Sequence, residues 1–376
     1  MIRFIHTADW QIGMKAVHVG AAAEAVRSER LKAARRVVEA ARERGVDFLL
    51  VAGDTFEDNA VDRVLVQKVA DTLASFGGPV YVIPGNHDPL VPGSVWDHPA
   101  WQSARNVRVL TEAAPVAIEG GTLYPSPVFQ KHSLNDPSRW INAQDATGIA
   151  IGIVHGTVEG VSQEVPDYPI RRDAAARSGL DYLALGHWHS AALFSDVDGA
   201  SRMAYSGTHE TTRFGERDSG NVLLVEVDRR GSPPQLTTVR TGDLRWESIV
   251  DELREPADVR CVREKIETWH DPAKSLIELR LSGIAYRESQ AELLRIDEIL
   301  KARFLYGGLD SSALVPAPDD DRWLDDVPMG VLREATKRLQ ALSSPAVIAD
   351  RPDYARPEVA MRAMLELYRI IQETPK

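Results

Sequence analysis

The N-terminal part of the chain alternates β-type runs with amphipathic helical segments, and this alternation constrains the fold more than any other feature. The predicted strands are residues 2–9, 46–54 and 79–88, and the predicted helices are residues 24–45 and 62–78. Gly45 ends the first helical segment, where a left-handed residue is common. Strands separated by helices favour right-handed βαβ units, so we predict a core sheet of parallel strands.

Residues 107–240 carry a different pattern, in which short strands are separated by turns. The predicted strands are VRVL, PVAIE, GTLYPSPV, GIAIGIVHG, DYLALGHWH, RMAYSGT and SGNVLLVEVD. One helix, residues 169–179, interrupts them, and a further strand is predicted near residues 235–249. We expect a second sheet packed on the first, which gives an α/β fold with a four-layer α/β/β/α sandwich.

The region beyond the sandwich alternates helices and strands again. The predicted helices are residues 258–270 and 286–304, and the predicted strands are residues 274–283 and 305–317. An acidic, proline-containing stretch, residues 316–326, precedes two terminal helices, residues 328–344 and 357–373. We therefore predict a sandwich domain over residues 1–240, a small α+β capping module over 241–320 and C-terminal helices over 321–376.

Composition excludes several classes of protein. The net charge is −11, from 44 basic and 55 acidic residues, which argues against a general affinity for nucleic acid or anionic membranes. No apolar run approaches the roughly 20 residues that span a bilayer, and the N-terminus lacks a secretory pattern, so we expect a cytoplasmic protein without a membrane partner. The single cysteine, Cys261, leaves metal binding to His, Asp, Glu and Asn.

Side chains that bind metal ions recur where the predicted strands end. They are Asp9, Asp54, Asn86, His87, Asp88, His155, His187 and His189. Because the carboxyl ends of parallel strands meet at one edge of a sheet, we expect these side chains to converge on one crevice. Adjacent glycines such as Gly53 and Gly85 allow the close backbone approach that convergence requires. Mixed oxygen and imidazole ligands suit a pair of divalent ions that share a carboxylate.

The ordered set HTAD, VAGD, PGNHD, IVHG and LGHWH resembles the calcineurin-like metallophosphoesterase superfamily, whose pattern is D-x-H, G-D, G-N-H-D/E, H and G-H-x-H. The segment YSGTHETTRFGE is similar to the Y-P-G-S-x-E-R-x-x-F-G-E segment of double-strand-break repair nucleases of the SbcD type. The matching residues are Tyr205, Gly207, Glu210, Phe214, Gly215 and Glu216. The resemblance covers roughly residues 1 to 240 and extends more loosely to the cap and terminal helices.

This resemblance implies a site for two divalent metal ions, with Mn(II) as the ion. The implied ligands are Asp9 and His189 for the first metal, Asn86, His155 and His187 for the second, and Asp54 as the bridge. A water molecule activated by the metals would attack a phosphodiester. His87 would stabilise the transition state or protonate the leaving oxygen, and Asp88 would orient the His87 ring.

Gln11 departs from the family pattern, which has a histidine ligand of the first metal at this position. Three alternatives stay open. Gln11 binds the first metal weakly through its amide oxygen, or His6 or His18 replaces the missing imidazole, or the site holds only one ion firmly and is slow or inactive as a nuclease. Loss of the imidazole is expected to weaken occupancy of the first position by roughly 10- to 100-fold.

The implied activity is that of a DNA exonuclease or endonuclease subunit working with an SMC-like ATPase of the SbcC type. The terminal helix would dock on this partner, although its apolar face also suits packing within its own domain. A homodimer is implied as well. Candidate DNA contacts are Arg171, Arg172, Arg213 and Arg217, whereas Glu57 and Thr211 replace residues with more positive or donating character. The alternatives are a phosphodiesterase for small nucleotides and a DNA-binding scaffold whose metal site is degenerate.

Overall fold

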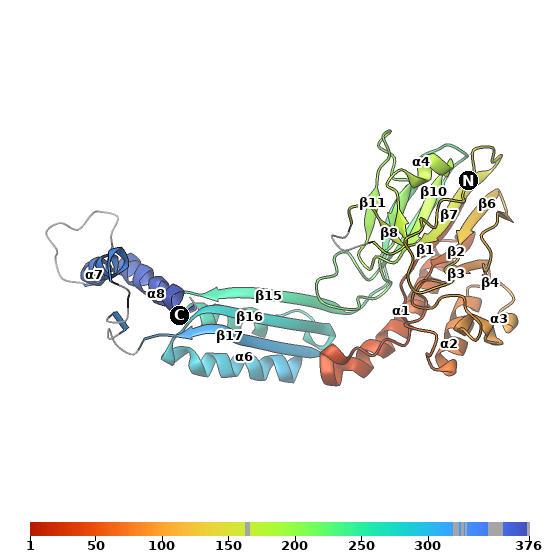
Figure 1. Ribbon diagram of the computed structural model, residues 1–376. Coiled ribbons are helices and arrows are strands. Elements are labelled where there is room, and N and C mark those ends of the chain that lie inside the picture. Colours follow the sequence, from red (N-terminus) through yellow and green to blue (C-terminus); the bar gives the residue numbers. More distant parts are fainter. Residues whose placement is uncertain (162–165, 319–322, 325–326, 328, 345–355, 374–376) are drawn as a thin grey trace. The chain divides into compact units, whose positions relative to one another are not determined.

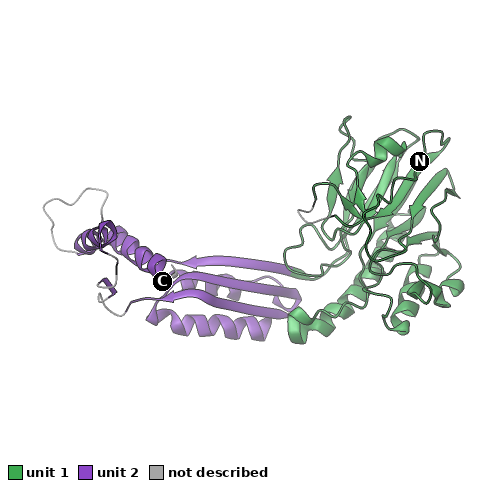
Figure 2. Ribbon diagram, in the orientation of Figure 1, with its two compact units in different colours: residues 1–245 green, residues 246–376 purple. Residues whose placement is uncertain are grey.

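The computed structural model of the chain describes residues 1–161, 166–318, 323–324, 327, 329–344 and 356–373 (Figure 1). The chain forms two compact units, Met1–Arg245 and Trp246–Lys376 (Figure 2). The second unit contains both the predicted capping module and the predicted terminal helices. The finer boundary at residue 320 stays a prediction.

The first unit is built on a sheet of six strands in the order β14-β13-β1-β2-β3-β4. These strands are β14 (Gln235–Arg240), β13 (Asn221–Val227), β1 (Ile2–Thr7), β2 (Phe48–Ala52), β3 (Val80–Ile83) and β4 (Val107–Val109). Strands β1 to β4 run parallel, as the helical crossovers predict, while β13 is antiparallel to both of its neighbours, β1 and β14.

A second sheet of six strands has the order β11-β12-β10-β7-β6-β5. These strands are β11 (Ala192–Phe194), β12 (Met203–Tyr205), β10 (Tyr182–Gly186), β7 (Ile149–His155), β6 (Gly121–Ser126) and β5 (Val116–Ile118). The four central strands are parallel and the two edge strands are antiparallel. A small two-stranded sheet joins β8 (Thr157–Val158) to β9 (Pro169–Ile170).

The two sheets pack face to face, and helices cover their outer faces (Figure 1). Alternate residues of β1 serve different layers: Phe4 lies between the sheets and stacks on Phe48 at 4.8 Å between ring centroids, whereas Ile5 faces the outer helices. The helices are α1 (Ala23–Glu43), α2 (Arg63–Ala74) and α3 (Ala100–Ser103) on the first sheet and α4 (Ala174–Ser178) on the second. The predicted four-layer sandwich is confirmed.

Three local predictions were wrong. Strands β4 and β13 belong to the first sheet rather than the second, because β4 pairs with β3 and β13 pairs with β1. The helix predicted over residues 169–179 is confined to α4, since Pro169–Ile170 pairs as β9 and Gly179 ends the helix in a left-handed conformation. The single strand predicted near residues 235–249 is two strands, β14 and β15 (Arg245–Leu253).

The second unit contains a sheet of order β15-β16-β17, formed by β15 (Arg245–Leu253), β16 (Ser275–Ala285) and β17 (Tyr306–Pro316). The parallel pair β16 and β17 is connected through α6 (Gln290–Arg303), and α5 (Asp258–Glu267) packs in the same core. Short 3-10 helices are η1 (Val17–Ala22), η2 (Val95–Asp97), η3 (Pro272–Lys274) and η4 (Arg287–Ser289).

Two helices, α7 (Val331–Ser343) and α8 (Pro357–Glu373), complete the second unit and pack on each other. Met364 of α8 is buried with Trp323 and Val327, and Tyr368 and Ile371 pack against the same cluster. Much of the predicted apolar face is thus covered within this unit. The acidic stretch predicted before these helices lies partly outside the described residues. None of the helices described here has the length and apolar character needed to cross a membrane.

Arg30 on α1 ties this helix to two loops of the first unit. Its guanidinium is almost completely buried and donates to the backbone carbonyls of Asp9, Trp10 and Glu210 and to the Thr208 hydroxyl. A buried cation is tolerated only when hydrogen bonds replace its water shell, and here four acceptors do so. Arg30 therefore anchors the loop after β1 to helix α1.

We expect Arg30→Met to lower the free energy of unfolding by about 3 kcal/mol, because the buried carbonyl groups would lose their donor. Urea unfolding of the full chain measures this change. Arg35→Met is the matched control, since Arg35 lies on the same helix but is exposed. Equal stability of the two variants would contradict the anchoring role of Arg30.

Candidate metal centre

The loops after β1, β2 and β3 and the ends of β7 and β10 meet at one edge of the sandwich. They contribute the predicted ligands, and several of these line a cavity of about 670 Å³ in the first unit. The predicted site residues that line it are Gln11, Asp54, His87, His187, His189 and Arg213. Asp9, Asn86 and His155 are buried beside them. Parallel strands in both sheets therefore deliver their side chains to a common crevice.

The Asp54 carboxylate lies at the centre of this arrangement and is 1% exposed. One oxygen, Oδ1, accepts the backbone N–H of His87 at 2.8 Å. The other, Oδ2, lies 3.4 Å from Nε2 of His155 and 3.5 Å from Nε2 of Gln11. Asp54 thus contacts groups from three other strand ends, which is the position that a bridging ligand needs.

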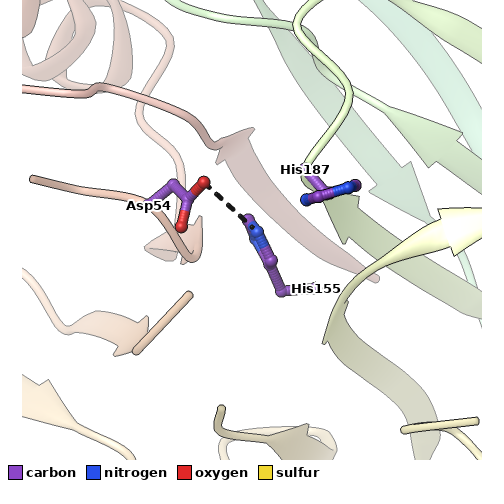
Figure 3. A group of neighbouring side chains, drawn as sticks. All are labelled: Asp54, His155 and His187. Carbon is purple, nitrogen blue, oxygen red and sulfur yellow. Dashed lines mark ion pairs between the residues drawn. The ribbon is translucent and has the colours of Figure 1, made fainter. Parts of the chain in front are cut away.

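Asn86, His155 and His187 converge on a second point. The amide oxygen Oδ1 of Asn86 lies 2.8 Å from His155 Nε2 and 2.9 Å from His187 Nδ1. Suitable ligand atoms of Asp54, His155 and His187 all lie within 4.8 Å of one another (Figure 3). The structure therefore brings together four of the predicted ligands.

The hydrogen-bond pattern around His155 fits a cation. Its Nδ1 lies 2.9 Å from the carbonyl oxygen of Ala52, which fixes a hydrogen on Nδ1. In a neutral ring the Nε2 lone pair would then face two other acceptors, the Asn86 amide oxygen and the Asp54 carboxylate. Acceptors facing one another require either a proton or a metal ion between them.

Asp9 and His189 form the other half of the predicted site. Both oxygens of the buried Asp9 carboxylate accept the backbone N–H of His187, at 3.0 and 3.1 Å. The Nδ1 atom of His189 lies 2.7 Å from the carboxylate of Glu216. His189 therefore carries a hydrogen on Nδ1 and keeps the Nε2 lone pair for a ligand.

Gln11 is 6% exposed, and its backbone N–H donates to the Asp54 carbonyl at 3.0 Å. Its side-chain nitrogen faces the Asp54 carboxylate, so the amide acts as a hydrogen-bond donor here. The alternative in which His6 replaces the missing imidazole is wrong, because its ring nitrogens contact the Tyr182 hydroxyl and the Leu185 carbonyl. His18 lines the cavity, and its proposed role stays a prediction.

His87 is oriented differently from the prediction. Its Nδ1 lies 2.9 Å from the backbone carbonyl oxygen of Glu57, which leaves Nε2 for proton transfer. The Asp88 carboxylate accepts the backbone N–H groups of Phe56 and Gly85 at 2.9 and 2.7 Å instead. The expectation that Asp88 orients the ring is therefore corrected: Asp88 fixes the two loops, and the Glu57 carbonyl orients His87.

Unusual backbone conformations concentrate at this site. Asp9, Gln11, Asp54 and His187 have φ values of +54°, +44°, +50° and +103°. Such left-handed conformations are uncommon for residues with a side chain and persist where the surrounding structure enforces them. Close approach matters as well, since a Cβ atom on Gly85 would lie 2.2 Å from Oδ1 of Asp54.

The family comparison agrees with this geometry. The family model for calcineurin-like phosphoesterases matches residues 2–191, which is more than half of the 376 residues. The chain belongs to the calcineurin-like phosphoesterase family. Enzymes of this family are metal-dependent phosphoester hydrolases, and the convergent side chains above suit that chemistry.

Two curated relatives are similar to this phosphoesterase. An uncharacterized metallophosphoesterase, YhaO of Bacillus subtilis (strain 168), is 26% identical over 284 residues, which cover 71% of this chain and 67% of YhaO. The DNA double-strand break repair protein Mre11 of Methanopyrus kandleri (strain AV19) is 25% identical over 291 residues, which cover 67% of this chain and 62% of Mre11. The chain thus spans about two thirds of the length of each.

Among solved structures, TT1561 of Thermus thermophilus superimposes on 64% of this phosphoesterase and 99% of its own chain. The TM-score is 0.41 and the sequence identity is 13%.

The donor set of this phosphoesterase fits divalent metal ions, because it combines carboxylate and amide oxygens with imidazole nitrogens. Asp54, Asn86, His155 and His187 would hold one ion, and Asp9 and His189 would contribute to a second beside Asp54. Divalent cations supply Lewis acidity, which activates a water molecule and offsets phosphate charge. The chain's own part is to hold the ligands, to orient His87 through the Glu57 carbonyl, and to leave His87 Nε2 for a proton.

Burial and close charges shift the ionisation of the centre. Burial alone would lower the pKa of His155, but the Asp54 and Asp9 carboxylates beside it raise that pKa to about 9. The same His155 charge holds the pKa of Asp54 well below its usual range despite burial. Burial raises the pKa of Asp9 to about 6, and burial together with His155 lowers that of His187 to about 4. The centre thus separates its groups into charged and neutral members.

The four predicted DNA-contacting arginines differ in their surroundings. Arg213 lines the cavity, whereas the side chain of Arg171 pairs with Asp173 at 2.8 Å. Arg172 donates to the Glu159 carbonyl at 2.8 Å, and Arg217 is exposed next to the cavity wall. Arg213 therefore has the best position for a substrate phosphate.

Sequence reasoning did not assign roles to the Glu57 carbonyl, Thr212 or Glu216. Glu216 lies within the segment that resembles the SbcD-type nucleases, so the sequence did single out this residue. Nothing in the sequence indicated that its carboxylate would contact His189. The Glu57 carbonyl gave no signal, because a backbone oxygen is present at every position. Glu210 of the same segment is completely buried and accepts the backbone N–H of Asp243 at 2.7 Å, so it is structural.

The metal-free protein is expected to lose stability as the pH rises from about 6.5 to about 9. The folded-state pKa of His155 lies above the ordinary value of 6.5, so its contribution is present below that value and is lost as the pH rises through about 9. Urea unfolding in the presence of a chelator, at several pH values, measures the effect. His155→Gln, which cannot titrate, should reduce this pH dependence, and an unchanged dependence would contradict the assignment.

Proposed function

We propose that this chain is a Mn(II)-dependent DNA nuclease of the SbcD type, which hydrolyses phosphodiester bonds as an exonuclease or endonuclease. The main support is the position of the SbcD-like segment. Its residues Thr212 to Glu216 form one wall of the cavity that contains Asp54, His87 and His187. A segment selected by sequence similarity thus borders the phosphoesterase site, where it would meet the substrate. The similarity to an Mre11 protein also supports this substrate class.

The cavity wall suits a phosphodiester substrate. The Arg213 side chain is 70% exposed and lies 3.8 Å from the Glu216 carboxylate. Because it is not packed in the interior, its guanidinium can turn towards a substrate phosphate. Trp188 and Phe214 line the same cavity and offer apolar surface for a sugar or base. His87 Nε2 would donate a proton to the leaving oxygen.

The nuclease proposal is tested by incubating hairpin and nicked DNA with the purified full chain and added Mn(II). We expect cleavage by the wild type and a loss of about 100-fold or more in His87→Ala, because general acid–base groups contribute 10²–10⁴-fold. His132→Ala is the matched control, since His132 is exposed and pairs with Asp167 away from the ligands.

Different outcomes separate the competing functions. Equal inactivity of wild type and His87→Ala on DNA, with metal bound, would overturn the nuclease proposal. Hydrolysis of a small diester such as bis(p-nitrophenyl) phosphate without DNA cleavage would favour a small-molecule phosphodiesterase. Inactivity on both substrates, relieved in Gln11→His, would favour a scaffold subunit with a weakened first metal position. The contact between the Gln11 amide nitrogen and Asp54 is the observation that supports this last alternative.

The proposal includes an SMC-like ATPase of the SbcC type and DNA as partners, and a homodimer as the working form. The acidic net charge of −11 makes a partner that supplies DNA affinity useful. Apolar side chains on or beside α7 and α8 stay exposed and suit a docking surface for the ATPase. They are Met329 at 81%, Val331 at 86%, Val359 at 53% and Met361 at 41%.

We expect the double substitution Val359→Glu and Met361→Glu to abolish a complex with the co-expressed ATPase, because charges at an apolar interface carry a desolvation cost. Size-exclusion chromatography measures complex formation. Leu294→Glu is the matched control, since Leu294 is 65% exposed on α6 of the same unit. A complex that survives the double substitution but not Leu294→Glu would contradict docking on α8.

A further inference from the structure

We propose that Glu216 is a positioning residue for the first metal: it fixes the tautomer and orientation of His189, and it compensates in part for the neutral Gln11. The inference concerns the metal site of a calcineurin-like phosphoesterase. It depends on metal binding and not on DNA as the substrate, so the two proposals can fail separately.

The Glu216 carboxylate contacts the histidine directly. Its Oε1 lies 2.7 Å from His189 Nδ1 and also accepts the Thr212 hydroxyl, while its Oε2 accepts the Thr212 backbone N–H at 2.8 Å. The Glu216 side chain is 4% exposed and that of His189 is 18% exposed. Each carboxylate oxygen therefore has a donor within the protein, and the His189 ring is one of them.

This contact has a consequence for the other ring nitrogen. A carboxylate accepts but does not donate, so the hydrogen of the His189 ring must sit on Nδ1. The Nε2 lone pair is then free to bind a cation. Carboxylate partners of this kind orient a histidine ligand and increase its basicity, and their loss typically weakens metal binding by 10- to 100-fold.

The local chain is built to bring the carboxylate back to His189. Gly215 has a φ of +87°, which glycine adopts without strain, and this turn returns Glu216 to Thr212 four residues earlier. The Thr212 hydroxyl also lies 3.1 Å from His189 Nδ1. A glutamate that served packing alone would not need two donors from Thr212 and a third from a predicted ligand.

Gln11 explains why such support matters in this chain. The family pattern has an imidazole at position 11, whereas Gln11 offers a neutral amide whose nitrogen faces Asp54. Asp9 and His189 are then the remaining predicted ligands of the first metal besides the shared Asp54. A stronger His189 ligand, backed by the Glu216 charge, would offset part of the missing imidazole.

The test is a Mn(II) titration of the full-length chain, followed by electron paramagnetic resonance and calorimetry. In Glu216→Gln, which keeps the shape but removes the charge, we expect one of two Mn(II) sites to weaken by about 10-fold or more and the other to stay unchanged. Glu216→Asp, which keeps the charge, should lose less. Glu43→Gln is the matched control, because the Glu43 side chain is 76% exposed on α1.

A second readout needs no metal. Long-range proton–nitrogen spectra of the metal-free protein should show the His189 hydrogen on Nδ1 in the wild type and a mixture of tautomers in Glu216→Gln. In the Gln11→His background, the loss of Mn(II) affinity caused by Glu216→Gln should be smaller, because a second imidazole is then present.

Three results would overturn the inference: equal weakening of both Mn(II) sites in Glu216→Gln, no weakening of either, or an unchanged His189 tautomer. The inference would also be overturned if the wild type bound one equivalent of Mn(II) and Glu216→Gln bound it with the same affinity. Failure to cleave DNA with normal Mn(II) binding would instead count against the nuclease proposal alone.

Discussion

The buried carboxylate of Asp54 is the interaction on which the rest of the site depends. It accepts the backbone N–H of His87, faces the side chain of His155 and receives the amide nitrogen of Gln11. A charged group with almost no exposure is tolerated only when such partners replace water. The loops after β1 and β3 and the end of β7 must therefore all reach Asp54, and this fixes where the two sheets meet.

The backbone is strained where these loops converge. Asp9, Gln11, Asp54 and His187 all adopt positive φ values, each of which is unfavourable for a residue with a side chain. The buried Arg30 holds the turn that contains Asp9, through hydrogen bonds to the carbonyl groups of Asp9 and Trp10. Strained backbone and buried charged side chains thus occur together at the predicted metal site, where a bound ion would stabilise them. Such local departures from favourable geometry are typical of functional sites.

Much of the fold follows from periodicity along the chain. Alternating strands and helices predicted β1 to β3 and their parallel order, and apolar runs predicted both sheets. The predicted places of β4 and β13 were wrong because the residues of a strand do not specify which sheet edge it will join. That choice depends on hydrogen-bonding partners far away in sequence, such as Val227 of β13 opposite Ile2 of β1.

Sequence by itself determined which predicted ligands meet at the site, because residues at strand ends must share an edge when the strands are parallel. Only the tertiary structure decided which atom faces which: the Glu57 carbonyl rather than Asp88 orients His87, and Glu216 reaches His189. Whether a hydrogen bond forms depends on differences of a few tenths of an ångström in the distance between donor and acceptor. In this site, donor and acceptor lie on segments that are far apart in the sequence. Motif order does not encode such distances, whereas packing of the complete sandwich fixes them.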